Sequence, residues 1–401
     1  MISLEQIKEI SIVSDSKIVM LVLDGLGGLS DIETGKTELE EASTPNFDYL
    51  AKNGICGLSI PVSHGITPGS GAGHLALFGY DPLQFTIGRG ILEAMGIGFD
   101  IAENDIAARG NFCSVDSHGI ITDRRAGRIT TDKCAELCSL LSKIRLEDAE
   151  FFIQPVKEHR FLFVLRGTGM SQEISDTDPQ KTGLTPIKSI AKEEAAKKTA
   201  KLVNEFVDKA AKFLAEHHPA NMILLRGFSQ KPSIPSIKEI YKLLPAAIAA
   251  YPMYRGLARL LGMDVFKAAD GIKEEIAILR ECYHNHDFFF LHVKQTDSAG
   301  EDGDFRRKVQ VIEEVDSFLP QLMDLKPDVI VVTGDHSTPA ILKGHSWHPV
   351  PFLLYSKWCR PDRVMEFSES ACASGSLGTF PAVDIMRLAM ANALKLGKFG
   401  A

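Results

Sequence analysis

The sequence of 401 residues has no run of roughly 20 apolar residues, which is the length that a helix needs to cross a membrane. Its first 25 residues include acidic side chains and no long uncharged apolar core, so they do not resemble a signal peptide. The net charge is −8, a balance that does not attract nucleic acid or an anionic membrane. We therefore expect a cytoplasmic protein without nucleic-acid or membrane partners.

Cysteine is also sparse. The seven cysteines are scattered, odd in number and include no Cys-x-x-Cys pair. Cys134 and Cys138 are four residues apart in a helical pattern, which favours one helix face over a pair of metal ligands. Reduced cytoplasmic thiols are the simplest interpretation.

What the sequence does contain is a series of apolar runs separated by helical patterns. Four runs are apolar throughout, as strands buried on both faces of a mostly parallel sheet are, and they span residues 17–23, 288–293, 329–333 and 351–355. Residues 304–325 carry apolar side chains at helical spacing. This alternation predicts an α/β fold with a mostly parallel sheet flanked by helices.

The middle of the chain has a different pattern. Strand-like runs of mixed polarity occur at residues 119–127, 159–167 and 220–229, and residues 188–218 predict one solvent-facing helix. We therefore expect a discontinuous core domain, residues 1–104 and 246–401. The remaining residues, 105–245, would form a smaller inserted α/β or α+β cap domain.

Carboxylate and imidazole side chains lie where the buried strands begin or end. They are Asp24, Asp297, Glu301, Asp335, His336, His345 and His348. Because the carboxyl ends of parallel strands meet at one edge of a sheet, these side chains should gather there. Each Asp alone could be a turn or helix-cap residue. So many carboxylates together repel one another unless cations neutralise them, and the mixed donors suit two ions of Mn²⁺, Mg²⁺ or Zn²⁺.

The segment "GITPGSGAGHLALFGYDP", residues 65–82, places Ser70 between glycines at the start of a helical pattern. The N–H groups and positive dipole end of a helix start favour a phosphate. A metal on the Ser70 oxygen would lower the pKa of the hydroxyl and make it a nucleophile. The alternative is a flexible Gly/Ser turn. The segment lacks the GK[ST] ending of a P-loop, so a nucleotide triphosphate cradle is not expected.

Basic side chains cluster in the predicted insert. Arg124, Arg125 and Arg128 lie within five positions, and guanidinium groups bind carboxylate and phosphate oxygens in bidentate fashion. Further candidates for an anionic substrate are His159, Arg160, Arg226 and Arg255. For any one of these arginines, a solvated basic turn is the alternative.

Together these segments resemble the cofactor-independent (bisphosphoglycerate-independent) phosphoglycerate mutases of the archaeal type, a branch of the alkaline phosphatase superfamily. The resemblance rests on Asp24 after the first strand and on "TPGS…HLALFGYDP", "TDxAGxDGD", "TGDHSTP" and "HSxxPVP". It extends from "LVLDGLGG" to "FPAVDIM" and includes "DRRAGR" in the insert.

The resemblance implies an alkaline-phosphatase-like core that binds two divalent metals, Mn²⁺ first, with Mg²⁺ or Zn²⁺ as alternatives. By motif, one metal would be held by Asp24, Ser70, Asp335 and His336, and the other by Asp297, residue 301 and His345. The family usually has His at the position of Glu301, a departure that puts the identity of the metal in question. Asp302, next to it, could substitute.

The implied activity is that of an isomerase of glycolysis that interconverts 3-phosphoglycerate and 2-phosphoglycerate. Ser70 would be the nucleophile and would carry the phosphate as phosphoserine, and no bisphosphoglycerate would be required. A metal-dependent phosphomonoesterase, or a mutase for another small phosphate ester, is the alternative.

Overall fold

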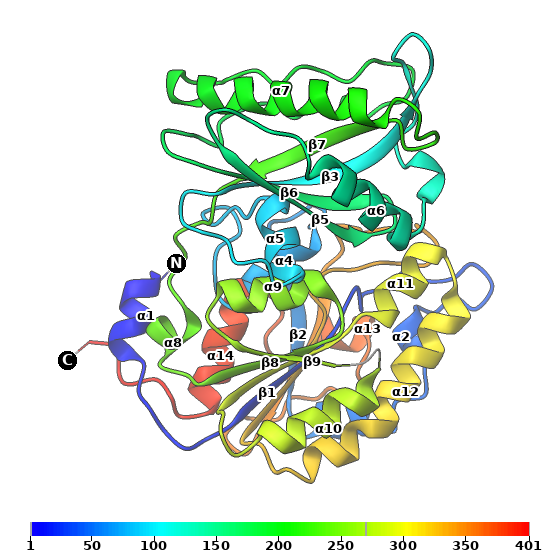
Figure 1. The fold of residues 1–401 in the computed structure, drawn as a ribbon. Coiled ribbons are helices and arrows are strands. Elements are labelled where there is room, and N and C mark those ends of the chain that lie inside the picture. The colour runs from blue at the N-terminus through cyan, green and yellow to red at the C-terminus, as the bar shows by residue number, and fades with distance from the viewer. Residues whose placement is uncertain (1, 269–270, 401) are drawn as a thin grey trace. The chain divides into compact units, whose positions relative to one another are not determined.

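In the computed structural model, which describes residues 2–268 and 271–400, the first apolar run forms β1 (Ile18–Leu23). This strand is fully buried in an eight-stranded sheet of order β13-β2-β12-β11-β1-β10-β8-β9 (Figure 1). The other strands are β2 (Ile55–Ile60), β8 (Pro245–Ala249), β9 (Asp264–Lys267), β10 (Phe288–Val293), β11 (Val329–Thr333), β12 (Val350–Ser356) and β13 (Thr379–Pro381). β12 is antiparallel to both neighbours, and the other pairs are parallel. The predicted α/β fold with a mostly parallel sheet is confirmed.

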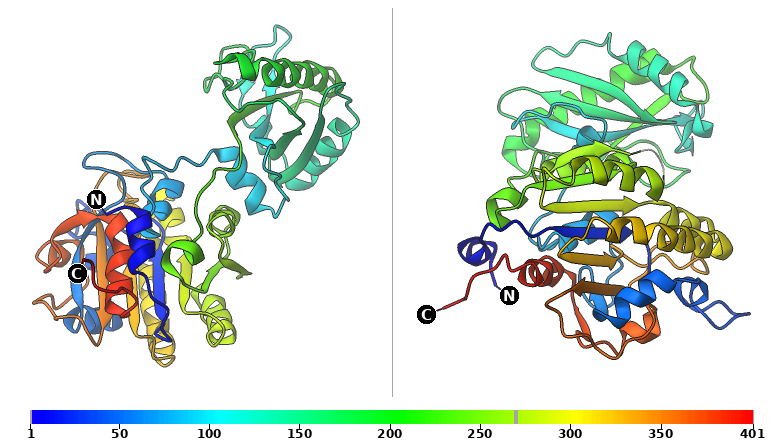
Figure 2. Two further views of the ribbon diagram at one scale, coloured as in Figure 1. Left: turned by 90° about the vertical axis from the view of Figure 1, so that its left-hand side faces the viewer. Right: turned by 90° about the horizontal axis from the view of Figure 1, so that it is seen from below.

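Helices cover both faces of this sheet (Figure 2). One face packs through alternate strand residues, such as Leu21 and Leu291, into a buried apolar cluster. The helices that join this cluster are α2 (Glu38–Glu41), α3 (Pro45–Lys52), α10 (Ile272–Cys282), α12 (Phe305–Met323) and α13 (Glu369–Cys372). α14 (Ile385–Asn392) packs on β11 with its own buried residues, which lie outside that cluster. Coverage of both faces explains why these strands are apolar throughout.

The strand register brings the polar strand ends together. Leu23 at the end of β1 lies beside Val293 at the end of β10, and Val22 lies beside Thr333 at the end of β11. β12 runs the opposite way, so the loop that precedes it reaches the same edge. β2 also ends there, because Ser59 pairs with Val350. The segment after β2 leads to α4 (Ser70–Leu77).

Residues of the predicted insert form an antiparallel sheet covered by helices. β3 (Ile106–Val115) pairs with β4 (Ile121–Asp123), β6 (Arg160–Arg166) and β7 (Met222–Ser229), and β5 (Glu150–Lys157) pairs with β6. The helices are α6 (Thr131–Leu141) and α7 (Lys197–Leu214), together with α5 (Arg89–Gly96), which precedes the predicted insert. Phenylalanine rings fill the core, with Phe163 and Phe206 4.5 Å apart between centroids.

The chain divides into two compact units, a larger one of Met1–Thr86 and Ile234–Ala401 and a smaller one of Ile87–Ser233. These borders precede those expected at 104/105 and 245/246. At the first border, α5 joins the smaller unit, where Glu93 lies 3.1 Å from Arg109 of β3. At the second, α8 (Ile237–Tyr241) joins the larger unit, where Glu239 pairs with Lys8 of α1 (Leu4–Ile10) at 3.0 Å.

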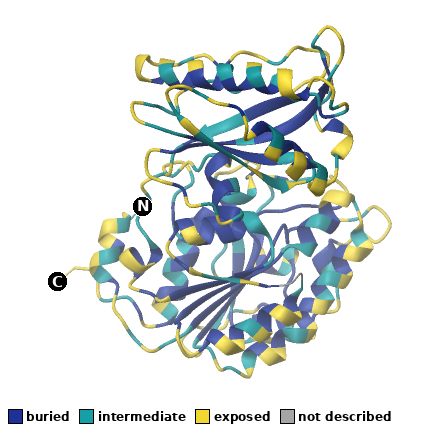
Figure 3. Cartoon of the chain, viewed as in Figure 1, coloured by how far each residue is buried: buried dark blue, intermediate teal, exposed yellow. Residues whose placement is uncertain are grey.

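The expected helix over residues 188–218 is wrong in length and in exposure. The helical part of this stretch is a short 3₁₀ turn, Glu194–Ala196, followed by α7. The preceding backbone bonds elsewhere, because the Ser189 N–H donates to the side chain of Asn204 and the Ile190 N–H donates to Ser175. One face of α7 is buried and the other exposed, as Figure 3 shows by colour. None of the described helices combines the length and the apolar character of a membrane span.

Candidate active site

The first candidate ligand group lies where β1, β11 and α4 meet. Nε2 of His336 lies 3.2 Å from Oδ1 of Asp24, 3.3 Å from Oδ2 of Asp335 and 3.2 Å from Oγ of Ser70. Asp24, Asp335 and His336 are completely buried. Gly73 allows α4 to approach this closely, because a Cβ there would lie 2.3 Å from the carbonyl oxygen of Asp335. Sequence positions separated by hundreds of residues therefore converge on one imidazole nitrogen.

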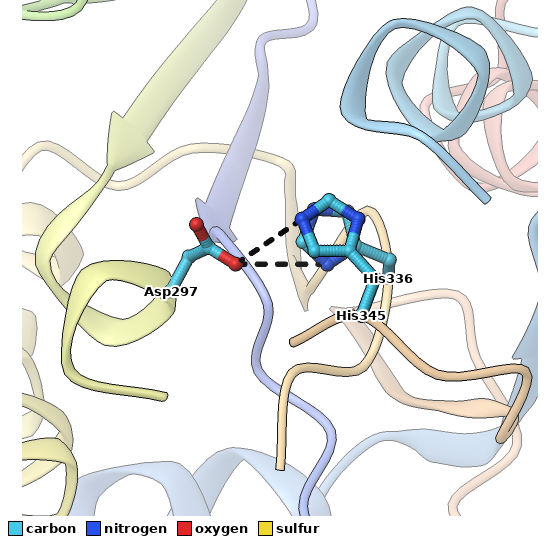
Figure 4. A group of neighbouring side chains, drawn as sticks. All are labelled: Asp297, His336 and His345. Atoms are coloured by element: carbon cyan, nitrogen blue, oxygen red, sulfur yellow. Dashed lines mark ion pairs between the residues drawn. The ribbon is translucent and has the colours of Figure 1, made fainter. Parts of the chain in front are cut away.

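The second group joins α11 (Gln295–Asp302) to the loop before β12. Oδ1 of Asp297 lies 3.7 Å from Nε2 of His345 and 3.9 Å from Nδ1 of His336 (Figure 4). The two imidazole rings stack with centroids 3.7 Å apart. Glu301 reaches the rim of this group, with Oε1 3.9 Å from His345 and a side chain that is 55% exposed. Asp302 instead pairs with Arg307 at 2.8 Å.

These residues fit divalent cations. Oδ1 of Asp24 is a buried carboxylate oxygen without a hydrogen-bond partner, which is costly unless a cation or donor approaches it. Oδ2 of Asp335 is buried with only imidazole nitrogens beside it, those of His74 and His336. Asp24, Asp335 and His336 present ligand atoms within 4.8 Å of one another, and so do Asp297, His336 and His345. Carboxylate and imidazole donors in this proportion suit Mn²⁺, Zn²⁺ or, with more oxygens, Mg²⁺.

A lysine that the sequence analysis did not single out lies between the two groups. Nζ of Lys294 donates to Oδ2 of Asp297 at 2.5 Å and to Oδ2 of Asp24 at 3.1 Å. Burial lowers the pKa of Lys294, but the two carboxylates outweigh burial and raise it. For Asp24, burial raises the pKa, whereas Lys294 and neighbouring imidazoles outweigh burial and hold it well below its usual value. The position of Lys294, one residue past the end of β10, was the sequence signal that could have indicated its place in the site.

Three further buried side chains contact the carboxylates of Asp24 and Asp335. Nδ1 of His74 lies 3.0 Å from Oδ2 of Asp335, and the Tyr254 hydroxyl donates to Asp24. Nε2 of His292 lies 3.2 Å from Oδ2 of Asp24. The rings pack on one another, with Tyr254 and His292 3.8 Å apart between centroids. A histidine inside an apolar strand was the only sequence signal, and the sequence analysis assigned no role to these residues.

His348, the other histidine before β12, does not join either group. Its Nδ1 lies 3.0 Å from the Ser346 hydroxyl, and its ring stacks on Trp347. His345 is instead held by its own Nδ1, which lies 2.9 Å from the carbonyl oxygen of Pro68. A carbonyl oxygen only accepts, so Nδ1 donates to Pro68 and Nε2 is the nitrogen that faces Asp297.

Two of the predicted substrate arginines are already paired in the smaller unit. Arg124 donates to both oxygens of the buried Asp178, at 3.1 and 2.6 Å. Arg226 lies 3.9 Å from the same carboxylate. Asp178 therefore fixes the direction of both guanidinium groups, which is the arrangement that an anion-binding site requires.

Arg109 and Arg89 are basic residues of the same unit that the sequence analysis missed. Burial, reinforced by neighbouring guanidinium groups, lowers the pKa of Arg109 to about 10. Those groups belong to Arg89, Arg160 and Arg226. His159 is buried beside Arg160, and burial together with that charge lowers its pKa to about 4. Because these positions come from α5, β3, β6 and β7, no local sequence pattern indicated a cluster.

The remaining predicted arginines lie elsewhere. Arg125 and Arg128 are exposed on the turn after β4, where their neighbour Asp123 accepts from the backbone N–H groups of Arg125 and Gly127. Arg255 belongs to α9 (Pro252–Leu260) of the larger unit. Its buried guanidinium group donates to the carbonyl oxygens of Ala249 and Ala250.

Comparison with known proteins identifies the family. A family model described as 2,3-bisphosphoglycerate-independent phosphoglycerate mutase matches residues 51–221. A protein of Thermotoga neapolitana, named a probable 2,3-bisphosphoglycerate-independent phosphoglycerate mutase, is 51% identical over 97% of this chain and 96% of its own length. The chain belongs to this family. A Thermus thermophilus protein of the same name is 48% identical over 98% of both chains.

A solved structure agrees with this phosphoglycerate mutase assignment, and a second one shares the fold. The cofactor-independent phosphoglycerate mutase of Thermoplasma acidophilum is 32% identical, with a TM-score of 0.72 over 94% of this chain and 100% of that one. A protein of Pyrococcus horikoshii is 30% identical, with a TM-score of 0.84 over 97% of this chain and 100% of that one. The predicted membership of the family is confirmed, and with it the assignment of the chain to the isomerases.

Proposed function

We propose that the chain interconverts 3-phosphoglycerate and 2-phosphoglycerate in glycolysis, in the cytoplasm, through a phosphoserine on Ser70 and without bisphosphoglycerate. The observation that carries this proposal is the position of Ser70. Its hydroxyl lies 3.2 Å from Nε2 of His336, and Ser70 is the first residue of α4. A nucleophile at a helix start has unpaired backbone N–H groups and a positive dipole end beside it, which suits an incoming phosphate.

Family membership and the donor set support two divalent cations at this site. We assign Asp24, Ser70, Asp335 and His336 to one cation and Asp297, Glu301 and His345 to the other. We propose Mn²⁺, with Mg²⁺ or Zn²⁺ as alternatives, because Glu301 adds a carboxylate oxygen at the second group. When bound, two such ions supply positive charge to the nucleophile and to the phosphate oxygens.

In the first step, Oγ of Ser70 forms a bond to phosphorus and the bond from phosphorus to the 3-oxygen of glycerate breaks. The serine proton ends on that 3-oxygen, so glycerate leaves as a free alcohol. In the second step, the 2-hydroxyl of glycerate attacks the phosphoserine and returns its proton to Ser70. The products are 2-phosphoglycerate and unmodified enzyme, and atoms and charge balance without an external reagent.

The chain also has to hold glycerate between the two steps. We assign its carboxylate to the arginines of the smaller unit, since Arg124 and Arg226 are oriented by Asp178 and can accept a second anion on their outer N–H groups. The predicted set also includes Arg125, Arg128, His159, Arg160 and Arg255, to which we add Arg89 and Arg109. Arg255 contributes only N–H groups not already bonded to the end of β8.

The proposal is tested by assaying formation of 2-phosphoglycerate from 3-phosphoglycerate with no bisphosphoglycerate present. Protein treated with a chelator should be inactive and should recover with Mn²⁺ or another divalent ion. Ser70→Ala should lower kcat by about 10³-fold or more while its circular dichroism stays that of the wild type. Activity that survives complete metal removal, or normal turnover of Ser70→Ala, would refute the scheme.

The same assay distinguishes the proposed mutase from the alternative, a phosphomonoesterase. A phosphatase would release inorganic phosphate from 3-phosphoglycerate and form no 2-phosphoglycerate. A mutase for another phosphate ester would leave 3-phosphoglycerate unchanged. Incubation with 3-phosphoglycerate followed by mass spectrometry of the intact protein should detect one added phosphate, which Ser70→Ala should lack.

A further inference from the structure

The hydroxyl of Thr338 connects the two candidate ligand groups. Thr338 is the threonine of the "TGDHSTP" segment, and it is completely buried. Its Oγ1 lies 2.6 Å from Oδ1 of Asp297 and 2.9 Å from Nδ1 of His336. Thr338 belongs to neither ligand group. It contacts Asp297 of the second group and also His336, which is common to both groups.

The direction of these two hydrogen bonds follows from how many protons are available. A threonine hydroxyl has one proton to donate. Asp297 receives the Lys294 ammonium at 2.5 Å on its other oxygen, so it is a carboxylate and only accepts. The Thr338 proton therefore goes to Asp297, and Thr338 can only accept from His336. Nδ1 of His336 must then carry a proton.

We propose that Thr338 is a positioning residue that keeps a proton on Nδ1 of His336, turns Nε2 toward Ser70, Asp24 and Asp335, and so leaves Nε2 as the nitrogen that a cation there would use. This inference rests on the proposed metal site. It also divides the ligands between the two groups. Nδ1 of His336 lies 3.9 Å from Asp297 but carries a proton, so it cannot bind a cation there. His336 therefore serves the Ser70 group, and His345 serves Asp297.

The backbone around Thr338 is built to hold its hydroxyl in place. Its N–H approaches the carbonyl oxygens of Gly25 and Gly27 at 3.2 and 3.0 Å. The buried ammonium of Lys308 donates to the carbonyl oxygens of Thr338 and Gly27, at 2.9 and 3.1 Å. Gly25, with φ +66°, leaves the hydroxyl its space, because a Cβ there would lie 2.6 Å from Oγ1.

Two substitutions separate the hydroxyl from the shape of the side chain. Thr338→Val keeps the shape and removes the hydroxyl, whereas Thr338→Ser keeps the hydroxyl. Thr333→Val is the matched control, because it removes another buried hydroxyl, which donates to the Pro351 carbonyl at 2.9 Å and contacts no candidate ligand. Circular dichroism and melting temperature establish that each variant is folded.

The first measurement is the tautomer of His336 in metal-free protein, from ¹⁵N shifts of histidine-labelled samples at one alkaline pH. The His336 signal is assigned by its absence in His336→Gln. Wild type, Thr338→Ser and Thr333→Val should show a proton on Nδ1, whether or not Nε2, which faces Asp24 and Asp335, also carries one. Thr338→Val should show a substantial population protonated on Nε2 alone. Unchanged protonation of Nδ1 in Thr338→Val, or an Nδ1 without a proton in the wild type, would overturn the proposal.

The second measurement is Mn²⁺ affinity by titration calorimetry. Thr338→Val should bind Mn²⁺ roughly 10- to 100-fold more weakly than wild type, the usual loss when a partner that orients a ligand is removed. Thr338→Ser should bind within a few-fold of wild type, as should Thr333→Val. Equal affinity in Thr338→Val would contradict the inference. Absence of Mn²⁺ binding by the wild type would contradict the proposed metal site instead, while the tautomer measurement would still decide the role of Thr338.

Discussion

The ammonium group of Lys294 lies 2.5 Å from a carboxylate oxygen of Asp297, three residues along the chain, and it also reaches Asp24 at 3.1 Å. Both carboxylates are completely buried, and the lysine side chain is only 19% exposed. One positive charge therefore balances two carboxylates, one directly after β1 and one in α11. Lys294 therefore binds carboxylate oxygens of Asp24 and Asp297, the same residues that we assign to the two divalent cations.

Lys294→Met should have opposite effects on stability and on metal binding. Without metal, the two buried carboxylates lose their cation, and the free energy of unfolding should fall by about 3 kcal/mol, measured by urea unfolding with chelator present. Mn²⁺ should bind about 10-fold more tightly by calorimetry, because a competing positive charge is gone. Lys267→Met, at an exposed position on β9, should change neither quantity. Weaker Mn²⁺ binding by Lys294→Met would show that the lysine assists the metal and does not compete with it.

The pair of Arg124 and Asp178 should contribute strongly to the stability of the smaller unit. Both oxygens of a buried carboxylate accept from one guanidinium group, so removing Arg124 leaves Asp178 with only the Gln180 N–H and the more distant Arg226 as partners. A double-mutant cycle with Arg124→Ala and Asp178→Ala should give a coupling energy of about 2 kcal/mol in urea unfolding. The exposed pair of Lys133 and Glu136, 2.8 Å apart, should give less than about 0.5 kcal/mol. Equal coupling in the two pairs would remove the assigned role of Asp178.

His159 should make the protein less stable in mild acid. Its pKa in the folded chain is about 4, below the ordinary value of roughly 6.5, because it is buried beside Arg160. Between these two values the unfolded chain binds the proton and the folded chain does not, so stability falls as pH falls through this window. Between pH 7 and pH 5 the loss assigned to His159 should be about 2 kcal/mol. Urea unfolding of His159→Gln should show that much less pH dependence, and His118→Gln, at an exposed position of the same unit, should match the wild type.

The sequence was sufficient for the strands of the larger sheet and for the candidate ligands that follow them. The runs at 288–293 and 329–333 are β10 and β11 to the residue, because strands buried on both faces are apolar throughout. Asp24, Asp335 and Asp297 lie one, two and four residues past the ends of such strands, and their convergence follows once the strands are parallel. The assignment of Ser70 rested on glycines and a helix start within a few residues of it.

The side chains around those ligands were not predictable in the same way. His292 lies in the middle of an apolar strand, and His74 and Tyr254 lie on helices, where each is compatible with ordinary packing. Their contacts with Asp24 and Asp335 depend on which faces of α4, α9 and β10 turn toward one another. The arginine cluster of the smaller unit has the same origin, since Arg109 and Arg160 meet only because β3 pairs with β6.

By itself, the sequence determined the α/β class, the family and the residues that end the buried strands, because those features are local in the chain and repeat in a recognisable order. Only the tertiary structure decided the domain borders, the lysine between the carboxylates and the contacts of Thr338 with Asp297 and His336. Each of these depends on distances between side chains that are far apart in sequence. A hydrogen bond or an ion pair exists only when both partners have been brought within about 3 Å, and chain order does not specify that distance.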